Sequence, residues 1–405
     1  MRTWVKAVAS GVLISILSRQ GIIGSAPGAN PATVPTTNAT DPGRVPTTVK
    51  QMLTPTKVSF KCDAISADAA VDAFSDQIGF AIRPAGEKVS LEGNPVTIHD
   101  ENVSLLTVVK HVCEQGNVLV EKEPFKCDLP ISFYARGKSV QPNWPCLFSK
   151  DTNTTIAPVI SRLYNKASSR DAERKVLYID FTFVTEPKVY LVGWYDSRYM
   201  ESLVDDRGVS LIPPLHKDSS SKGFFRYRTS LGLREVIGGY EYPTEPNPQI
   251  KHLRAKFKVR LGFDVKRYDL SAAMNVGGQA TFPLTKNIKA ALTGVIPKTA
   301  GAPDQFELMM SIPGVKSSDS SFFQSDDFLK CDFAASDDQG RLWRIIKFDP
   351  ETAPNGGSTM RLQVTRLVTD WRADRGKATK LTALIPSRIE DAVIPFEVDD
   401  LSVPR

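Results

Sequence analysis

The chain has 405 residues, of which 41% are hydrophobic, 24% are charged and 9% are aromatic. This balance is typical of a globular protein, and it excludes a wholly disordered chain, a collagen-like fibre and a long coiled coil. The net charge of +6 is lower than a dedicated nucleic-acid-binding protein usually carries, so nucleic acid is an improbable partner. Because the chain has only four histidines and five cysteines, we expect neither a metal ion nor a cofactor.

The first 26 residues have the pattern of a signal peptide. Arg2 and Lys6 precede an apolar stretch at residues 7–17, and small residues follow at 24–26. The stretch is shorter than the roughly 20 apolar residues that a membrane-spanning helix needs. We therefore expect residues 1–26 to be removed, and the mature protein to be periplasmic or extracellular with no integral membrane segment.

Residues 27–56 are rich in proline and threonine. A segment of this composition buries too little apolar surface to offset the entropy lost on ordering. We expect a disordered linker between the signal peptide and the first domain.

A pattern of strand, helix and strand occurs twice after this linker. In the first copy an alternating strand begins at Val58, Ser66 can cap a helix, and an extended segment resumes at Phe80. In the second copy the strand begins at Val96 and Ser104 can cap the helix, each 38 residues after its counterpart. Each unit alone is too small to bury its helix face, so the two units predict one compact α/β domain.

The two copies share further details. The helices end in Gln-x-Gly or Gln-Gly turns at residues 77–79 and 115–116, and the second copy opens with Val-Thr-Ile at 96–98 and Asn-Val-Ser-Leu-Leu at 102–106. This arrangement resembles the secretin and TonB N-terminal short domain and related secretin N-domains, over residues 57–124. The resemblance implies a non-enzymatic module that binds a protein partner in the bacterial envelope. The membrane barrel of a secretin has no counterpart in the sequence, so transport is not implied.

The sequence after residue 130 is rich in alternating strand patterns. Strands are predicted at 176–184 and 306–312, and Asp-Asp-x-Gly hairpin turns at 205–208 and 337–340. These features recur about 130 residues apart, which indicates two tandem antiparallel β-sandwiches, and a single β domain is the alternative. The spans are 131–265 and 266–405. The predicted fold class is therefore α+β, and the chain closes with a predicted hairpin formed by residues 381–385 and 392–398.

Motifs for catalysis are missing. No two histidines have the spacing of a zinc site on one element, and there is no Gly-x-Ser-x-Gly nucleophile turn and no phosphate-binding loop. The paired acids at 205–206 and 337–338 could hold calcium or serve a glycosidase, but hairpin turns explain them better. We expect no catalytic residue and no enzymatic activity.

A basic strand is the most pointed feature. Residues 251–260 alternate so that four cations share one face and apolar residues share the other. The four are Arg254, Lys256, Lys258 and Arg260, and Arg226 and Arg228 lie upstream. Together they could contact a polyanion, although a solvated face that resists edge-to-edge aggregation is the favoured interpretation. Residues 57–130 carry a net charge of −5 and residues 131–405 carry +7.

The five cysteines predict at most limited disulfide bonding. Cys62 and Cys331 share strand parity with apolar neighbours and are expected in the core. Cys127 and Cys146 lie in proline-rich sequence and form the candidate disulfide, although connectivity does not follow from sequence.

Two functional hypotheses follow. The first is an exported bacterial envelope protein with a non-enzymatic interaction or scaffold role, because the whole chain resembles uncharacterised exported bacterial proteins that join such a module to β-sandwiches. The alternative is a carbohydrate-binding or carbohydrate-active β-sandwich protein. The aromatic residues that would line its groove are Trp194, Tyr195, Trp343 and Trp371.

Overall fold

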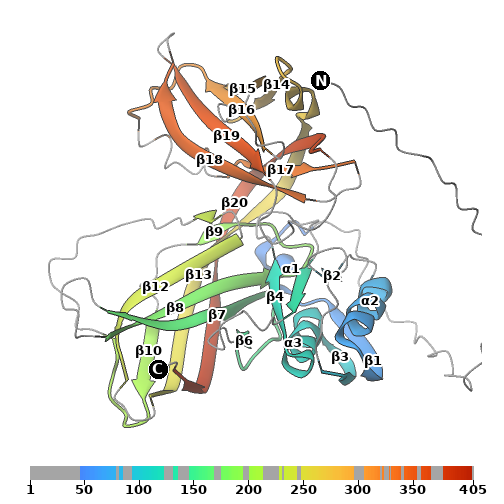
Figure 1. Cartoon of the computed structure of the whole chain (residues 1–405), viewed down its shortest axis with the longest axis vertical. Coiled ribbons are helices and arrows are strands. Elements are labelled where there is room, and N and C mark those ends of the chain that lie inside the picture. Colours follow the sequence, from blue (N-terminus) through green and yellow to red (C-terminus); the bar gives the residue numbers. More distant parts are fainter. Residues whose placement is uncertain are drawn as a thin grey trace, which may run out of the picture. The chain divides into compact units, whose positions relative to one another are not determined.

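The computed structural model describes part of the chain. The described residues are 46–78, 82–84, 94–122, 131–135, 146–167, 175–194, 200–212, 228–229, 232–243, 248–295, 305–319, 322, 328, 330–338, 342–353, 357–365 and 377–403. All of them belong to the larger of two compact units, residues 39–405. The predicted signal peptide lies outside the described residues. As predicted, the described part is mostly antiparallel β-sheet with few helices (Figure 1). No helix in it is both long and apolar enough to cross a membrane.

The N-terminal module contains two small sheets and two helices of equal length. Its elements are β1 (Lys57–Ile65), α2 (Ala67–Ile78), β2 (Ile82–Pro84), β3 (Val96–Ser104), α3 (Leu105–Gly116), β4 (Val118–Lys122) and β5 (Ile131–Ala135). Strands β1 and β3 form an antiparallel pair, while β5 lies between β2 and β4 in a three-stranded sheet. The predicted order of strand, helix and strand is therefore present twice.

The predicted 38-residue repeat is confirmed at the level of strand register. Shifting the bounds of α2 by 38 residues gives the bounds of α3. Lys61 pairs with His99, which is also its counterpart in the repeat, and register shifts occur on both sides of this pair. The pairing is what a local twofold axis between β1 and β3 produces.

Backbone details follow the same twofold relation. Ala64 and Asn102 are counterparts, and both have positive φ angles, 48° and 50°. The N–H of Ala64 donates to the hydroxyl of Thr97, and the N–H of Asn102 donates to the hydroxyl of Ser59, each at 3.0 Å. Ser59 and Thr97 are counterparts in the repeat. The hydroxyl of each accepts a hydrogen bond from the bulge of the other copy, which explains why both positions carry a β-hydroxyl residue.

Helix capping is repeated too. The hydroxyl of Ser66 accepts from the N–H of Ala69 at 3.2 Å, and the hydroxyl of Ser104 accepts from the N–H of Thr107 at 3.1 Å. Each bond satisfies one of the free donors of a helix start. Both serines were predicted as caps from the sequence.

Two larger sheets follow the module. The five-stranded sheet has the order β11-β12-β8-β7-β6. Its strands are β6 (Leu147–Phe148), β7 (Ile156–Ala167), β8 (Lys175–Thr185), β11 (Arg228–Thr229) and β12 (Gly232–Glu241). The ten-stranded sheet has the order β10-β13-β20-β17-β18-β19-β16-β15-β14, with β9 also paired to β13. Its strands are β9 (Leu191–Trp194), β10 (Met200–Asp205), β13 (Gln249–Asp269), β14 (Gln279–Pro283), β15 (Lys289–Val295), β16 (Gln305–Ile312), β17 (Asp332–Ser336), β18 (Leu342–Thr352), β19 (Ser358–Thr365) and β20 (Lys380–Ser402).

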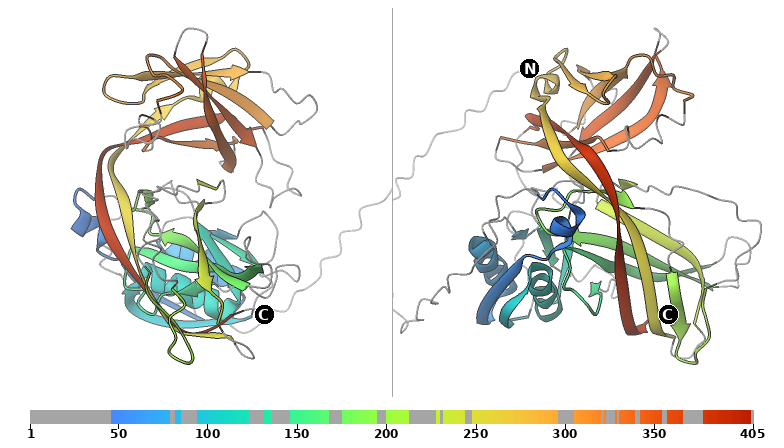
Figure 2. Two further views of the ribbon diagram at one scale, coloured as in Figure 1. Left: turned by 90° about the vertical axis from the view of Figure 1, so that its left-hand side faces the viewer. Right: turned by 180° about the vertical axis from the view of Figure 1, so that it is seen from behind.

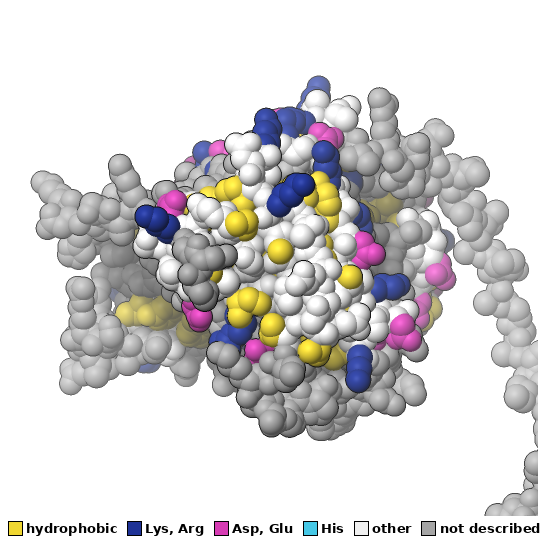
Figure 3. Space-filling model, turned by 90° about the horizontal axis from the view of Figure 1, so that it is seen from above, with side chains coloured by type: hydrophobic (Ala, Val, Ile, Leu, Met, Phe, Trp, Pro, Cys, Tyr) yellow, Lys and Arg dark blue, Asp and Glu magenta, His cyan; other side chains and the backbone are white. Residues whose placement is uncertain are grey.

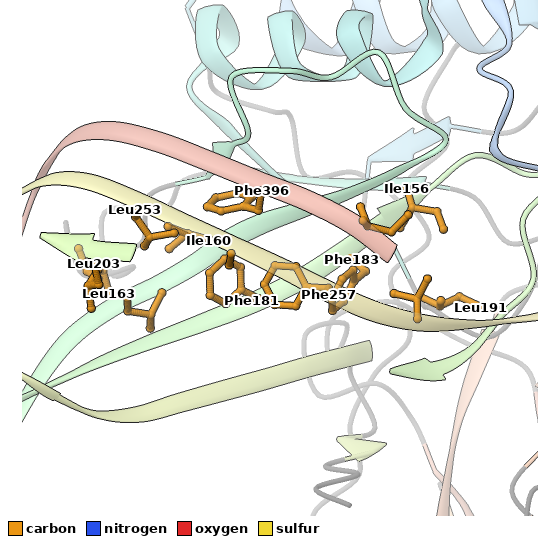
Figure 4. Close-up of a cluster of buried hydrophobic side chains, with 14 of the residues drawn as sticks. Ile156, Ile160, Leu163, Phe181, Phe183, Leu191, Leu203, Leu253, Phe257 and Phe396 are labelled. Atoms are coloured by element: carbon orange, nitrogen blue, oxygen red, sulfur yellow. The ribbon is translucent and has the colours of Figure 1, made fainter. Parts of the chain in front are cut away.

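The two large sheets share a core rich in aromatic side chains. Phe181 of β8 packs edge-on against Phe257 of β13 and Phe396 of β20, with ring centroids 4.9 and 5.1 Å apart. Phe183 adds a third edge-to-face contact, 5.2 Å from Phe257. Figure 4 shows these rings between the ribbons of the two sheets. Such pairs stabilise beyond the burial of their area, so this cluster is the main tie between the sheets.

The long pairing of β13 with β20 contradicts two of the predictions made from the sequence. They pair antiparallel from Gln249–Ser402 to Asp269–Thr382 and run side by side in all the views (Figures 1 and 2). The expected boundary between residues 265 and 266 falls inside β13, so the two spans do not form separate consecutive sheets. The predicted final hairpin is wrong as well, because residues 380–402 form one continuous strand.

The physical reason is that β13 offers a partner for the whole length of β20. Pro386 lies between the two arms of the predicted hairpin, but it pairs with Val265 inside the ladder. Asp264, the residue before Val265, has a φ of 49°. The ladder skips Asp264 on β13 and Ser387 on β20. The hydroxyl of Ser387 donates to the Phe263 carbonyl at 3.4 Å. This local irregularity accommodates proline, which cannot donate a ladder hydrogen bond.

The first acidic turn is confirmed as a hairpin turn, and residues 339–340 of the second predicted turn lie outside the described part of the chain. Asp205 ends β10, its carboxylate accepts from the N–H of Arg207 and of Val209, and Gly208 has a φ of 80°. Asp337 follows β17, which pairs with β18 directly beyond the turn. The second turn adjoins a separate core on strands β14–β19, around the 3-10 helix Ser271–Met274.

The end of the expected linker is structured. Helix α1 (Val49–Leu53) begins at the cap residue Thr48 and buries Met52 in the core shared by the large sheets. Residues 46–56 therefore do not form a free spacer, because Met52 adds an apolar anchor that the composition of residues 27–56 as a whole conceals. The remainder of the linker, up to residue 45, lies outside the described residues.

We predict opposite effects for two alanine-to-glycine changes in the module. Ala64→Gly should raise the free energy of unfolding by about 1 kcal/mol, because it removes the strain of a non-glycine residue at positive φ. Ala73→Gly, at an exposed position inside α2, should lower it by about 1 kcal/mol. Urea unfolding of both variants checks this, and equal destabilisation by the two changes would contradict the strained bulge.

Candidate functional site

Helix α3 has a wide buried face. Seven of its residues are buried, namely Leu105, Leu106, Val108, Val109, Val112, Cys113 and Gly116. The apolar cluster that they join also contains Phe148, Ala157, Val159 and Val184 from the five-stranded sheet and its edge. The seven positions lie within one half of the helix circumference, and Leu106 and Cys113 make this buried face wider than that of α2. The shared cluster therefore places α3, together with Val118 of β4, at the interface between the module and the five-stranded sheet.

Polar contacts surround this docking interface. The hydroxyl of Ser104 donates to the Thr152 carbonyl at 2.5 Å, and the hydroxyls of Thr107 and Thr152 lie 2.9 Å apart. The ammonium of Lys110 donates to the Ser149 carbonyl at 3.3 Å. The same serine that caps α3 thus also fixes the segment between β6 and β7.

Helix α2 is the twofold counterpart of α3, but it has a different surface. Thr107 and Lys110 of α3 correspond to Ala69 and Asp72 of α2, and both α2 residues are exposed. Asp76, one turn further along, is exposed as well. Where α3 has Thr107 and Lys110 in contact with the segment between β6 and β7, α2 thus has a small and an acidic residue. In the described part of the chain these α2 residues face solvent.

The β1–β3 pair presents a second exposed surface of the module. Lys61 and His99 lie at its centre and are exposed, and His99 Nε2 is 2.5 Å from the carboxylate of Asp63. Asp100, which follows His99 on β3, has its carboxylate 2.7 Å from His111 of α3. These histidines have a structural explanation as ion-pair or hydrogen-bond partners.

A buried carboxylate ties the N-terminal segment to the β-sheets. The side chain of Glu186 is completely buried and accepts from the N–H and the hydroxyl of Thr56, at 3.0 and 2.7 Å. The ammonium of Lys188 is 3.1 Å from Glu186 and also donates to the Thr56 hydroxyl. Burial raises the pKa of Glu186, while the nearby Lys188 charge and the Thr56 bonds oppose that shift.

The basic strand does not present an open cationic face. Strand β13 is an interior strand, with β9 and β10 on one side and β20 on the other. Each of the four cations forms an ion pair with a carboxylate of a neighbouring strand. The contacts are Arg254 to Glu397 (3.4 Å), Lys256 to Glu201 (2.6 Å), Lys258 to Asp391 (2.8 Å) and Arg260 to Asp391 (3.7 Å). Cross-strand pairing of opposite charges explains the alternation, so the polyanion hypothesis loses its main support.

Several sequence-predicted residues lie outside the described residues. They are Arg226, Cys127, Tyr195 and Trp371, so the predicted Cys127–Cys146 disulfide stays a prediction. Only the backbones of Arg228 and Trp194 are described. Trp343 is 4% exposed and belongs to the core on strands β14–β19, as does Cys331, while Cys62 is buried in the module. Trp343 is therefore a core residue, and the side chains of the other three candidate sugar-binding aromatics lie outside the described part of the chain.

Figure 3 shows the molecule from above. Hydrophobic side chains of the described residues lie scattered there in small groups among other side chains and backbone. The scattered side chains of this face do not indicate a binding site. The exposed surfaces of α2 and of the β1–β3 pair thus form the candidate functional site, which we call the module surface.

Comparisons with known proteins identify no family. No family model matches the chain, and no curated protein matches it. One solved structure, described as the crystal structure of the conserved domain protein from Bacillus anthracis, is 10% identical and has a TM-score of 0.17. The match covers 63% of this chain and 90% of that one. A likeness this low carries no conclusion about fold or function.

The environment of Glu186 predicts a pH dependence of stability. Because its pKa is raised in the folded protein, its contribution is fully present below the unfolded pKa of about 4.3 and is lost as pH rises through the folded pKa. The free energy of unfolding of the wild type, minus that of Glu186→Gln, should therefore fall as the pH increases from about 4 to 7. Urea unfolding at several pH values measures this difference.

Glu397→Gln is the matched control. The hydrogen bond from Lys150 lowers the pKa of Glu397, so the corresponding difference should fall as the pH decreases through that lowered pKa. Slopes of the same sign for both variants would contradict the role of burial at Glu186.

Proposed function

We propose that the chain is a non-enzymatic envelope protein whose N-terminal module, predicted over residues 57–124 and extended in the structure by β5, binds a protein partner. The larger β-sheets serve as its scaffold. The proposal includes export to the periplasm or the extracellular space, for which the pattern of residues 1–26 is the support. It also includes membership of the module in the secretin and TonB N-terminal short domain group, for which the support is the repeated order of strand, helix and strand.

The observation that carries the proposal is the unequal burial of two equivalent helices. Helix α3 is covered by the five-stranded sheet, whereas α2 keeps exposed residues at the corresponding positions. The module is thus held firmly on one side and exposes an ordered, acidic helix on the other. Rigid presentation of a surface lowers the entropy that binding costs.

We further propose that the large sheets form a β-sandwich architecture. Its support is the shared aromatic core, in which side chains of β8 meet those of β13 and β20. Alternating inward and outward residues on paired sheets are typical of such folds. A sandwich gives the module a stiff base and needs no catalytic residue. No observation on the described residues favours the carbohydrate alternative.

Site-specific photo-crosslinking tests the proposal. A photoreactive benzoylphenylalanine is placed at Asp72 on α2, at Lys61 on β1, or at the exposed Lys289 of β15 as the control. Each full-length variant is irradiated in envelope extract of the organism that encodes the chain. We expect Asp72 and Lys61 to yield a crosslinked product of the same mass and partner, and Lys289 to yield none.

Two results would contradict the proposal. One is crosslinking of the same proteins from all three positions, which would indicate non-specific contact. The other is a specific partner at Lys289 with nothing at Asp72 or Lys61. Circular dichroism of each variant confirms that the fold is intact.

A further inference from the structure

The outer face of the β13–β20 pair brings together three side chains that commonly bind metal ions. His252 lies directly opposite Asp399 in the register, and Glu397 lies opposite the next outward residue of β13. One ligand atom from each of the three lies within 4.8 Å of the others. All three side chains are about one third exposed. Because paired strands fix their positions, the set is held on a rigid support.

A cation already occupies the point where the carboxylates converge. The ammonium of Lys150 lies 3.2 Å from Glu397 Oε1 and forms an ion pair with Asp399 Oδ2. Lys150 reaches this point from the loop between β6 and β7, and its own N–H donates to the Glu397 carbonyl at 2.8 Å. Its side chain is 50% exposed. The ammonium can therefore move into solvent while the backbone stays attached.

The ligand set has the charge and orientation that a divalent ion requires. Glu397 and Asp399 both form ion pairs with Lys150, so their carboxylate oxygens already face a cation. Arg254 contacts the second oxygen of Glu397 at 3.4 Å and leaves Oε1 directed at the cluster. Such outer contacts orient metal ligands. His252 Nδ1 lies 2.7 Å from Asp399 Oδ1, and the two atoms must separate to about 3.3 Å to share an ion with bonds of about 2.1 Å.

We propose that His252, Glu397 and Asp399 form a binding site for a divalent transition-metal ion such as Zn²⁺, and that Lys150 closes this site when no metal is bound. The metal replaces the ammonium between the carboxylates, and water completes its coordination. One imidazole and two carboxylates suit Zn²⁺. Ca²⁺ and Mg²⁺ are less suitable, because both prefer a shell made only of oxygen. This site is independent of the proposed partner-binding module.

Isothermal titration of the metal-free full-length protein with ZnCl₂ tests the site. Lys150→Met removes the competing cation, so we expect it to bind Zn²⁺ at least tenfold more tightly than the wild type. Asp399→Asn in the Lys150→Met background should remove this binding. His252→Gln in the same background serves as a second test should the Asp399 variant be unfolded.

The neighbouring ion pair between Lys251 and Asp400 provides matched controls. It joins the same strands and belongs to no group of three possible metal ligands among the described residues, so Lys251→Met and Asp400→Asn should leave Zn²⁺ binding unchanged. Co²⁺ should produce visible d–d absorption in Lys150→Met, and His252→Gln should abolish it. The proposal is overturned if Lys150→Met binds no Zn²⁺ at millimolar concentration, or if Asp399→Asn and His252→Gln leave its binding intact.

Discussion

The antiparallel pairing of β13 with β20 is the constraint on which most of the structure depends. It joins residues near 250 to residues near 400 and continues through the irregularity at Asp264. One half of the pair supplies Phe257 and Phe396 to the core shared with the five-stranded sheet, and the other half supplies Ile385 to the core on strands β14–β19. The same register aligns His252 with Asp399. Sheet packing and the proposed metal site therefore have one origin.

The N-terminal module consists of a duplicated unit whose two helices have different surroundings. Its twofold relation extends to bulges, caps and hydrogen bonds, so each copy stabilises the other. Yet α3 carries Leu106 and Cys113 where α2 carries Asp68 and Ser75. These substitutions turn one helix toward the β-sheets and leave the other at the surface. The difference supplies both the anchor and the proposed binding surface.

Local patterns were predictable, and long-range pairing was not. The caps Ser66 and Ser104 and the repeat followed from residues close together in sequence. The single strand β20 could not be predicted, because a proline at position 386 locally favours a turn. Val265, with which Pro386 pairs, is more than 100 residues away in the sequence. Likewise the cations of β13 predicted a basic face, since Glu201 and Asp391 come from distant strands. His252 and Asp399 are 147 residues apart, so no local motif indicated their contact.

Hydrogen–deuterium exchange of the full chain tests the asymmetric anchoring of the module most directly. Helices α2 and α3 both have 12 residues, so their amides are well matched for comparison. The account predicts slower exchange in α3, because opening it also breaks its contact with β7 and β8. Equal rates in the two helices, or slower exchange in α2, would contradict docking through α3 and the free surface on α2.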